Sequence, residues 1–179
     1  VYHWTPAIIE DSFSGLKWLY FSLKSVARMP RSLALALAYW KGTPEDLRVG
    51  IYSKLGVRFG RNARLGKSVY IDHTALGYVQ IGEGAIVSDD VIIIAHTQTP
   101  PYLRPFYGSD RWGPRSVKIG DGAVIGEGAI ILPGVTIGNA ARVLKASVVN
   151  SDVAAESTVG GMPAKPVTVD VETAAKSYE

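Results

Sequence analysis

The chain has 179 residues, enough for one domain with a sizeable core, and it contains no cysteine. The composition therefore excludes disulfides, a thiolate nucleophile and a cysteine-ligated metal site. Lys and Arg number 19 against 16 Asp and Glu, and the positive excess lies within residues 1–56. No apolar run reaches the roughly 18 residues of a membrane-spanning helix, and the N-terminus lacks the features of a secretion signal. We therefore expect a cytoplasmic protein.

Residues 1–56 are predicted to be a helical segment. Its first helix covers about 11–29 and stops before a proline, which cannot continue a helix. Leucine and aromatic side chains form an apolar stripe on it, and Lys17, Lys24 and Arg28 share one face. A basic amphipathic helix of this kind can make peripheral contact with an anionic membrane. In the alternative interpretation, the stripe packs on the β-helix or on a partner subunit and the basic residues face water.

Two shorter helices are predicted next. An alanine- and leucine-rich run favours a helix over about 31–41. A third helix begins within 43–46, where the Thr43 hydroxyl is a candidate cap, Pro44 suits the first turn and two carboxylates follow. This helix should end near 54–56.

A six-residue repeat begins at Phe59. Its first position is apolar, its second is often glycine, and its fifth is small or β-branched. The repeat is interrupted around 77–80, resumes at Ile81 and stops after His96. The following segment, 97–118, is rich in proline, arginine and aromatic residues, and a loop of this length in a compact repeat domain is usually functional. We therefore expect one long extruded loop.

From Ile119 the repeat continues in seven sixes, predicted to keep one register, with Ala155 as the last first-position residue and Val159 in a fifth position. A fixed six-residue period is typical of a parallel β-helix, in which three sixes make one triangular turn. First-position side chains fill the interior, and glycine allows close approach at the corners. Residues 57–167 are thus predicted to be a mainly β domain of about four to five coils, followed by a tail at 168–179.

The spacing also brings candidate catalytic residues together. If the extra residues of the interruption around 77–80 are allowed for, 71–76 and 93–98 form the same side of adjacent coils. Asp72 and His73 then lie on the coil next to that of His96. An imidazole beside a carboxylate is a suitable general base, because histidine titrates near neutral pH and the carboxylate can orient the ring. His73 is either part of this site or a surface histidine. Asp72 is either part of it or a turn-capping residue.

One known family shares these features. The hexapeptide-repeat acyltransferases resemble this chain in the coil sequence 119–138, in the closing motif 161–166 and in a catalytic histidine at the position of His96. The likeness extends over 57–167 and is closest to the maltose, galactoside and capsular-sugar O-acetyltransferases. It implies a left-handed β-helix and a homotrimer, with acetyl-CoA bound between neighbouring subunits. The implied reaction is O-acetylation of a sugar hydroxyl, which would belong to a surface polysaccharide, a glycolipid precursor or another saccharide. The implied process is polysaccharide biosynthesis.

The resemblance also implies roles for single residues. His96 would be the general base, and Asp72 would orient it or position the acceptor. Acceptor binding would involve His73 and three residues of the loop, Tyr102, Arg104 and Trp112. Contact with acetyl-CoA would involve three small residues beside the pantetheine arm and two cations near its phosphates: Gly128, Ala129 and Ala146, with Lys145 and Lys165.

Several alternatives remain open. Serine or an amine is a different acceptor class, although the serine enzymes of this family carry a larger helical N-terminal domain. A non-catalytic trimeric scaffold would keep the coil but would not need His96 beside such a loop. Carbonic anhydrases built on the same coil require three histidine ligands, and the coil offers only His73 and His96, so no metal is expected. Nucleic acid is not an expected partner, because the repeat region balances acidic and basic residues and has no binding motif.

Overall fold

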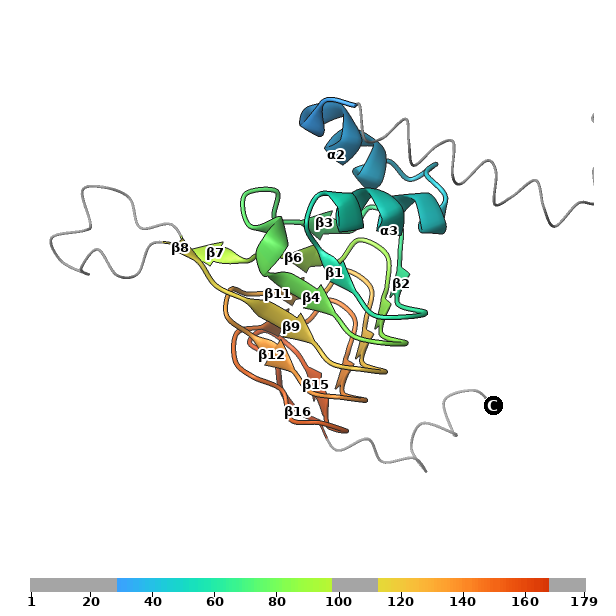
Figure 1. Ribbon diagram of the computed structural model, residues 1–179. Coiled ribbons are helices and arrows are strands. Elements are labelled where there is room, and N and C mark those ends of the chain that lie inside the picture. Colours follow the sequence, from blue (N-terminus) through green and yellow to red (C-terminus); the bar gives the residue numbers. More distant parts are fainter. Residues whose placement is uncertain (1–28, 98–112, 168–179) are drawn as a thin grey trace, which may run out of the picture.

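The computed structural model describes residues 29–97 and 113–167 (Figure 1). In this part of the chain, short strands wind into a stack of coils, and two helices cover the end of the stack at the first coil. The predicted helix over 11–29, the middle of the long loop and the tail at 168–179 lie outside the described residues. None of the described helices has the length and hydropathy that a bilayer span requires.

Three faces, named A, B and C in chain order, surround the interior of the coil. Face A holds β1 (Arg58–Phe59), β4 (Val79–Ile81), β9 (Val117–Ile119) and β12 (Thr136–Ile137). Face B holds β2 (Arg64–Leu65), β5 (Ile86–Val87), β10 (Val124–Ile125), β13 (Arg142–Val143), β15 (Thr158–Gly160) and the antiparallel β16 (Lys165–Pro166). Face C holds β3 (Tyr70–Ile71), β6 (Ile92–Ile93), β11 (Ile130–Ile131) and β14 (Val148–Val149). The turns between the faces are the A–B, B–C and C–A corners.

First-position side chains fill the interior, as the repeat predicts. Ile125 is 0% exposed, and the backbone register places it between Val87 and Val143 of the adjacent coils. Glycine is required in the second position where coils stack closely, because a Cβ on Gly138 would lie 2.4 Å from the nitrogen of Ala155. The predicted fold class, a left-handed parallel β-helix of four to five coils, is confirmed.

The last coil departs from the predicted register. Ile137 pairs with Ile119, 18 positions before it, but with Val153 only 16 positions after it. The C–A corner after β14 is therefore two residues shorter than the repeat requires. Val153 and Val159 consequently hold first positions, and Ala155 is exposed on a corner. The prediction of seven sixes in one register was wrong in this coil.

Two irregular segments leave the coil at the C–A corner. The predicted interruption is a short 3-10 helix, η1 (Leu76–Tyr78), after which β4 restores the register. The long loop begins and ends in an antiparallel pair, β7 (His96–Thr97) with β8 (Gly113–Pro114). Since β9 already begins at Val117, the loop is shorter than the predicted range 97–118.

The two helices lie close to their predicted positions, as α2 (Arg31–Tyr39) and α3 (Glu45–Lys54). The predicted cap by Thr43 is wrong. Its hydroxyl donates to the carbonyl of Leu37 in α2 at 2.5 Å, and Pro44 occupies the N-cap position of α3 with no side-chain cap. Leu37 O also accepts from the backbone N–H of Trp40, the C-cap residue of α2, at 3.2 Å, so the Thr43 hydroxyl is a second donor to a carbonyl of the last helical turn.

Helix α3 replaces the coil that would precede the first one. In the second coil, the carbonyl of Val87 accepts from Gly66 N at 2.7 Å, and that of Val91 accepts from Tyr70 N at 2.9 Å. The equivalent carbonyls of the first coil belong to Leu65 and Val69, and the described residues before this coil, 29–57, form helices and no further coil. Buried backbone groups of this kind need a donor from elsewhere in the molecule.

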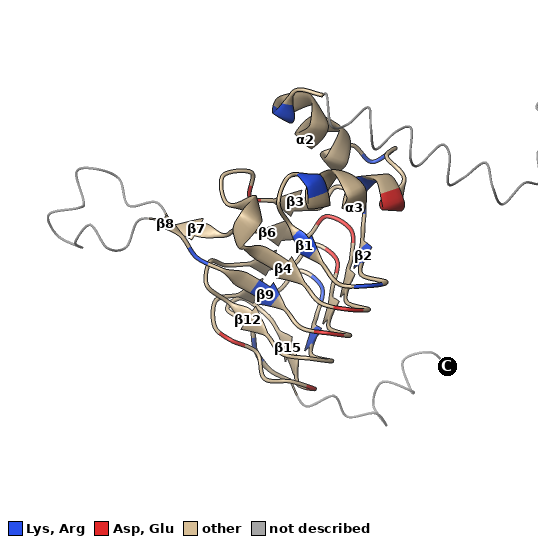
Figure 2. Cartoon of the chain, in the orientation of Figure 1, with Lys and Arg blue, Asp and Glu red and all other residues tan. Residues whose placement is uncertain are grey.

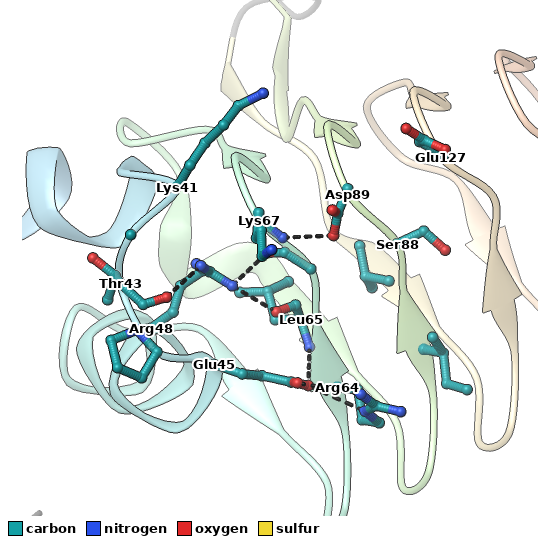
Figure 3. A pocket seen from close by; sticks show the side chains of 15 residues that line it. Lys41, Thr43, Glu45, Arg48, Arg64, Leu65, Lys67, Ser88, Asp89 and Glu127 are labelled. Atoms are coloured by element: carbon teal, nitrogen blue, oxygen red, sulfur yellow. Dashed lines mark hydrogen bonds and ion pairs between the residues drawn. The ribbon is translucent and has the colours of Figure 1, made fainter.

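Arg48 and Tyr52, one helical turn apart on α3, provide these donors. Arg48 is 1% exposed and donates to Leu65 O at 2.9 Å and Gly66 O at 2.7 Å (Figure 3). The hydroxyl of Tyr52 donates to Val69 O at 3.0 Å. The remaining donors of Arg48 reach the carbonyls of two residues at and after the end of α2, Ala38 at 3.1 Å and Thr43 at 2.6 Å. The helical segment is thus a cap on the open edge of the β-helix.

Candidate active site

Asp72 and His96 meet at the C–A corner, on adjacent coils. Asp72 directly follows β3, and its backbone N–H donates to Ile93 O at 2.9 Å. His96 lies three positions after the end of β6 and is the first residue of β7, where the long loop departs. Nδ1 of His96 donates to Oδ2 of Asp72. The proximity predicted from spacing is therefore observed.

The Asp72 carboxylate is 1% exposed and surrounded by donors. Oδ2 also accepts from Ala95 N at 3.1 Å, and Oδ1 accepts from the Thr74 hydroxyl at 2.7 Å and from Thr74 N at 3.1 Å. Burial by itself raises the pKa of this carboxyl, but the hydrogen bonds from His96, Thr74 and the backbone outweigh burial and hold the pKa below its usual value. Asp72 is therefore ionised at neutral pH.

An ionised carboxylate at Nδ1 determines how His96 can act. Nδ1 must carry a proton to donate to Asp72, so in the neutral ring Nε2 has the free lone pair. The His96 side chain is 34% exposed, which leaves the ring open to a substrate. The pair has the arrangement of a general base with a carboxylate that orients it.

His73 lies at the same corner but is directed toward the cap. Its Nδ1 is 3.1 Å from the hydroxyl of Tyr70, the two rings are edge to face, and its carbonyl accepts from Arg31 of α2 at 2.8 Å. A cavity of about 320 Å³ between α2 and β3 is lined in part by Tyr70 and His73. The other residues proposed for acceptor binding, Tyr102, Arg104 and Trp112, lie outside the described residues.

The residues predicted to contact acetyl-CoA lie mostly at the B–C corner. Gly128 and Ala146 both have positive φ, and Ala146 N donates to Glu127 O at 2.8 Å, which places them on adjacent coils. Lys145 is exposed beside them. Ala129 is 0% exposed, so its side chain belongs to the interior and only its backbone is available to a ligand.

Lys165 reaches the same corner through the closing motif. It is exposed on β16, opposite Gly160 of β15. The motif is held by Gly161, whose N–H donates to the hydroxyl of Ser147 at 3.2 Å and whose carbonyl accepts from Val148 N at 3.0 Å. Lys145 and Lys165 are therefore both on the B–C side of the last coils, whereas His96 is at the C–A edge of face C.

A cavity of about 700 Å³ lies away from the Asp72–His96 pair, under the α2–α3 connection (Figure 3). Cations and carboxylates both line it, among them Arg48, Lys67 and Asp89. Figure 2 likewise shows Lys, Arg, Asp and Glu interspersed over the coils. Within 29–97 and 113–167, no three His, Cys, Asp or Glu side chains come together as a metal site.

Sequence comparison relates the chain to acetyltransferases. No model of a known protein family matches it. It is 37% identical over 131 residues to serine acetyltransferase 4 of Arabidopsis thaliana, covering 70% of this chain and 34% of the relative. It is 35% identical over 133 residues to the serine acetyltransferase of Salmonella typhimurium, covering 72% and 45%. The chain thus spans about a third to a half of the length of these relatives.

Solved structures show the same fold. The polySia-specific acetyltransferase NeuO matches with a TM-score of 0.54 and 25% identity, over 63% of this chain and 51% of that one. A hexapeptide-repeat acetyltransferase of Vibrio cholerae, solved with acetyl-CoA, matches with a TM-score of 0.55 over 93% and 92% of the two chains. At 18% identity, the second likeness concerns the fold alone.

The repeat, the three parallel faces and the histidine–aspartate pair at the loop define a β-helix protein of the hexapeptide-repeat class. The sequence relatives narrow this class, and the chain belongs to the hexapeptide-repeat acetyltransferase family. The closer likeness to maltose and galactoside enzymes is not confirmed, because the curated relatives above are serine acetyltransferases.

Proposed function

We propose that the chain is an acetyl-CoA-dependent O-acetyltransferase in which His96 is the general base. The observation that carries this proposal is the bond from His96 Nδ1 to the buried, ionised Asp72, which leaves the lone pair on Nε2 of a partly exposed ring. A structural scaffold has no need for this arrangement. Family membership supports the acetyl transfer.

The proposed mechanism is direct transfer. His96 Nε2 removes the proton of the acceptor hydroxyl while the hydroxyl oxygen forms a bond to the thioester carbonyl carbon. His96 then gives this proton to the sulfur as the carbon–sulfur bond breaks, so the products are an acetyl ester and the free thiol of CoA. Asp72 remains ionised and stabilises the His96 ring while both ring nitrogens carry protons. With no cysteine in the sequence, no acyl-cysteine intermediate is available.

The proposed acetyl-CoA site is the B–C corner. Lys145 and Lys165 would face the phosphates, and Gly128 and Ala146 would let the pantetheine arm approach the backbone. The Vibrio cholerae neighbour, which has the same fold, was solved with acetyl-CoA. Ala129 would contribute through its backbone alone.

A homotrimer would bring together His96 of one chain and the proposed acetyl-CoA residues of another. In one chain, His96 lies at the C–A corner and the proposed acetyl-CoA residues lie at the B–C corner, so face C separates them. The outward side chains of face C are apolar, in a row formed by Tyr70, Ile92, Ile130 and Val148. Such a face is suited to burial against another subunit. The corner of a neighbouring chain would then bring acetyl-CoA to His96.

For the acceptor, the first candidate is a sugar hydroxyl of a polysaccharide or glycolipid precursor, and it rests on the likeness of the coil and closing motif to the sugar enzymes. The second candidate is the hydroxyl of L-serine, because the curated relatives are serine acetyltransferases. The chemistry at His96 is the same for both. The proposed contacts from His73 and from Tyr102, Arg104 and Trp112 would decide between them.

Peripheral membrane contact on the cytoplasmic side is a separate proposal, based on the basic face predicted for residues 11–29. Deletion of this segment should release the protein from anionic vesicles while the trimer remains intact. Loss of the trimer on deletion would instead favour packing of the segment on the coil.

The decisive experiment measures thiol release from acetyl-CoA with a panel of sugars and with L-serine. His96→Ala should lower turnover by about 10²- to 10⁴-fold without changing the secondary structure. Glu156→Gln, at an exposed corner of the last coil, is the control and should retain full activity. Retained turnover in His96→Ala would refute the mechanism. No thiol release with any acceptor, together with no binding of CoA at millimolar concentration, would refute the function.

A further inference from the structure

Thr74 contacts both members of the Asp72–His96 pair, although the sequence did not single it out. Its hydroxyl donates to Asp72 Oδ1 at 2.7 Å. The same hydroxyl oxygen is 3.2 Å from Nδ1 of His96. One side chain therefore touches the orienting carboxylate and the ring nitrogen that this carboxylate binds.

The number of donors around Asp72 shows what the hydroxyl contributes. An ionised carboxylate offers about four acceptor positions. In Asp72 four donors occupy them: His96 Nδ1 and Ala95 N at Oδ2, and the hydroxyl and N–H of Thr74 at Oδ1. The hydroxyl has a single hydrogen, which is used at Oδ1. Toward His96 Nδ1, Thr74 can therefore present only an acceptor.

We propose that Thr74 is a positioning residue for the reaction assigned to His96, because its hydroxyl holds the Asp72 carboxylate in place and keeps the proton of the His96 ring on Nδ1. Because only hydrogen-bond acceptors surround Nδ1 of His96, the neutral tautomer with the proton on Nδ1 and the lone pair on Nε2 is favoured. The kinetic part of this inference rests on the proposed acetyl transfer. The part that concerns the tautomer does not.

The hydroxyl is not needed to form the turn itself. The carbonyl of Asp72 accepts from Ala75 N at 3.1 Å, and its side chain accepts from Thr74 N at 3.1 Å. These bonds to the backbone close the turn whatever side chain stands at position 74. Thr74→Val therefore preserves the shape and the backbone bonds but removes the hydroxyl, and Thr74→Ser restores the hydroxyl without the methyl group.

The test combines tautomer spectroscopy with kinetics. With ¹⁵N-labelled histidine, NMR chemical shifts distinguish a proton on Nδ1 from one on Nε2, and His96 is assigned by comparison with His3→Gln and His73→Gln, since the chain has 3 histidines. We expect His96 of the wild type to be protonated on Nδ1 and Thr74→Val to shift it measurably toward the other tautomer. We expect kcat to fall about tenfold in Thr74→Val, as for loss of one hydrogen bond, with KM nearly unchanged. Thr74→Ser should recover kcat to within about threefold of the wild type.

Two results would overturn the inference. One is a Thr74→Val variant with unchanged tautomer and unchanged kcat. The other is equal loss in Thr74→Val and Thr74→Ser together with a lowered melting temperature in both, which would assign Thr74 a purely structural role. If the wild type shows no acetyl transfer, the proposed function fails, and the NMR comparison still tests the effect of Thr74 on His96.

Discussion

Replacing Arg48 tests whether α3 truly substitutes for a missing coil. The guanidinium donates to four backbone carbonyls at 2.6–3.1 Å, and the side chain is 1% exposed. A buried carbonyl that loses its donor costs about 1–3 kcal/mol. At the lower limit, four carbonyls give about 4 kcal/mol for Arg48→Met, which keeps much of the length of the side chain but none of its donors. Removal of a buried charge offsets part of this cost.

Chemical denaturation of the full chain measures the effect. A loss of about 4 kcal/mol is a large share of a typical stability of about 5–15 kcal/mol and should lower the melting temperature by about 10 °C. The control is Arg61→Met, which removes an exposed ion pair with Glu83 at 3.0 Å, with the Arg61 side chain 84% exposed. It should cost less than about 1 kcal/mol. If Arg48→Met and Arg61→Met are equally stable, the capping argument is refuted.

Two predictions concern the dependence of stability on pH. The pKa of Asp72 lies below its ordinary value of 3.8 in the folded protein, so its contribution to stability is complete above that pH and is lost as the pH falls through the lowered value. Urea unfolding should therefore show Asp72→Asn less stable than the wild type at pH 7, with a difference that shrinks below about pH 4; a constant difference would contradict this. Burial raises the pKa of Tyr52 from 10.0 to about 12, so the stability that depends on its neutral phenol is complete below pH 10 and is lost as the pH rises toward 12. Tyr52→Phe should flatten the stability curve over this interval, and a wild-type curve that is already flat there would refute the assignment.

The repeat predicted most of the fold because each six encodes its own local geometry. An apolar residue every six positions has only the interior to fill, and the close stacking at Gly138 admits no side chain. The register failed only after β14, where a corner two residues shorter than the repeat carries no marker in the sequence. The same local reasoning predicted a Thr43 cap, because it could not include the competing carbonyl of Leu37.

The site was predicted where it depends on register and missed where it depends on side-chain direction. Counting along the coil placed Asp72 beside His96. It gave no reason to single out Thr74, although a hydroxyl two positions after an aspartate is a known local partner of that carboxylate. Arg48 could not be found in this way, since its acceptors are carbonyls of another part of the chain, which no pattern of side chains reveals.

The separation of His96 from the B–C corner leads to a test of the shared active site. If each site combines His96 of one subunit with Lys145 and Lys165 of the next, then His96→Ala chains and Lys145→Glu/Lys165→Glu chains are each inactive for a different reason. When the two are unfolded, mixed in equal amounts and refolded, about one quarter of the sites should receive an intact His96 and an intact pair of lysines, because each half is drawn independently from a cyclic assembly. Thiol release should then recover to about one quarter of the wild-type value, while each variant refolded alone stays inactive. No recovery from mixed trimers, shown to be mixed by mass spectrometry, would mean that one chain holds the whole site, and acetyl-CoA would have to bind at the C–A corner instead.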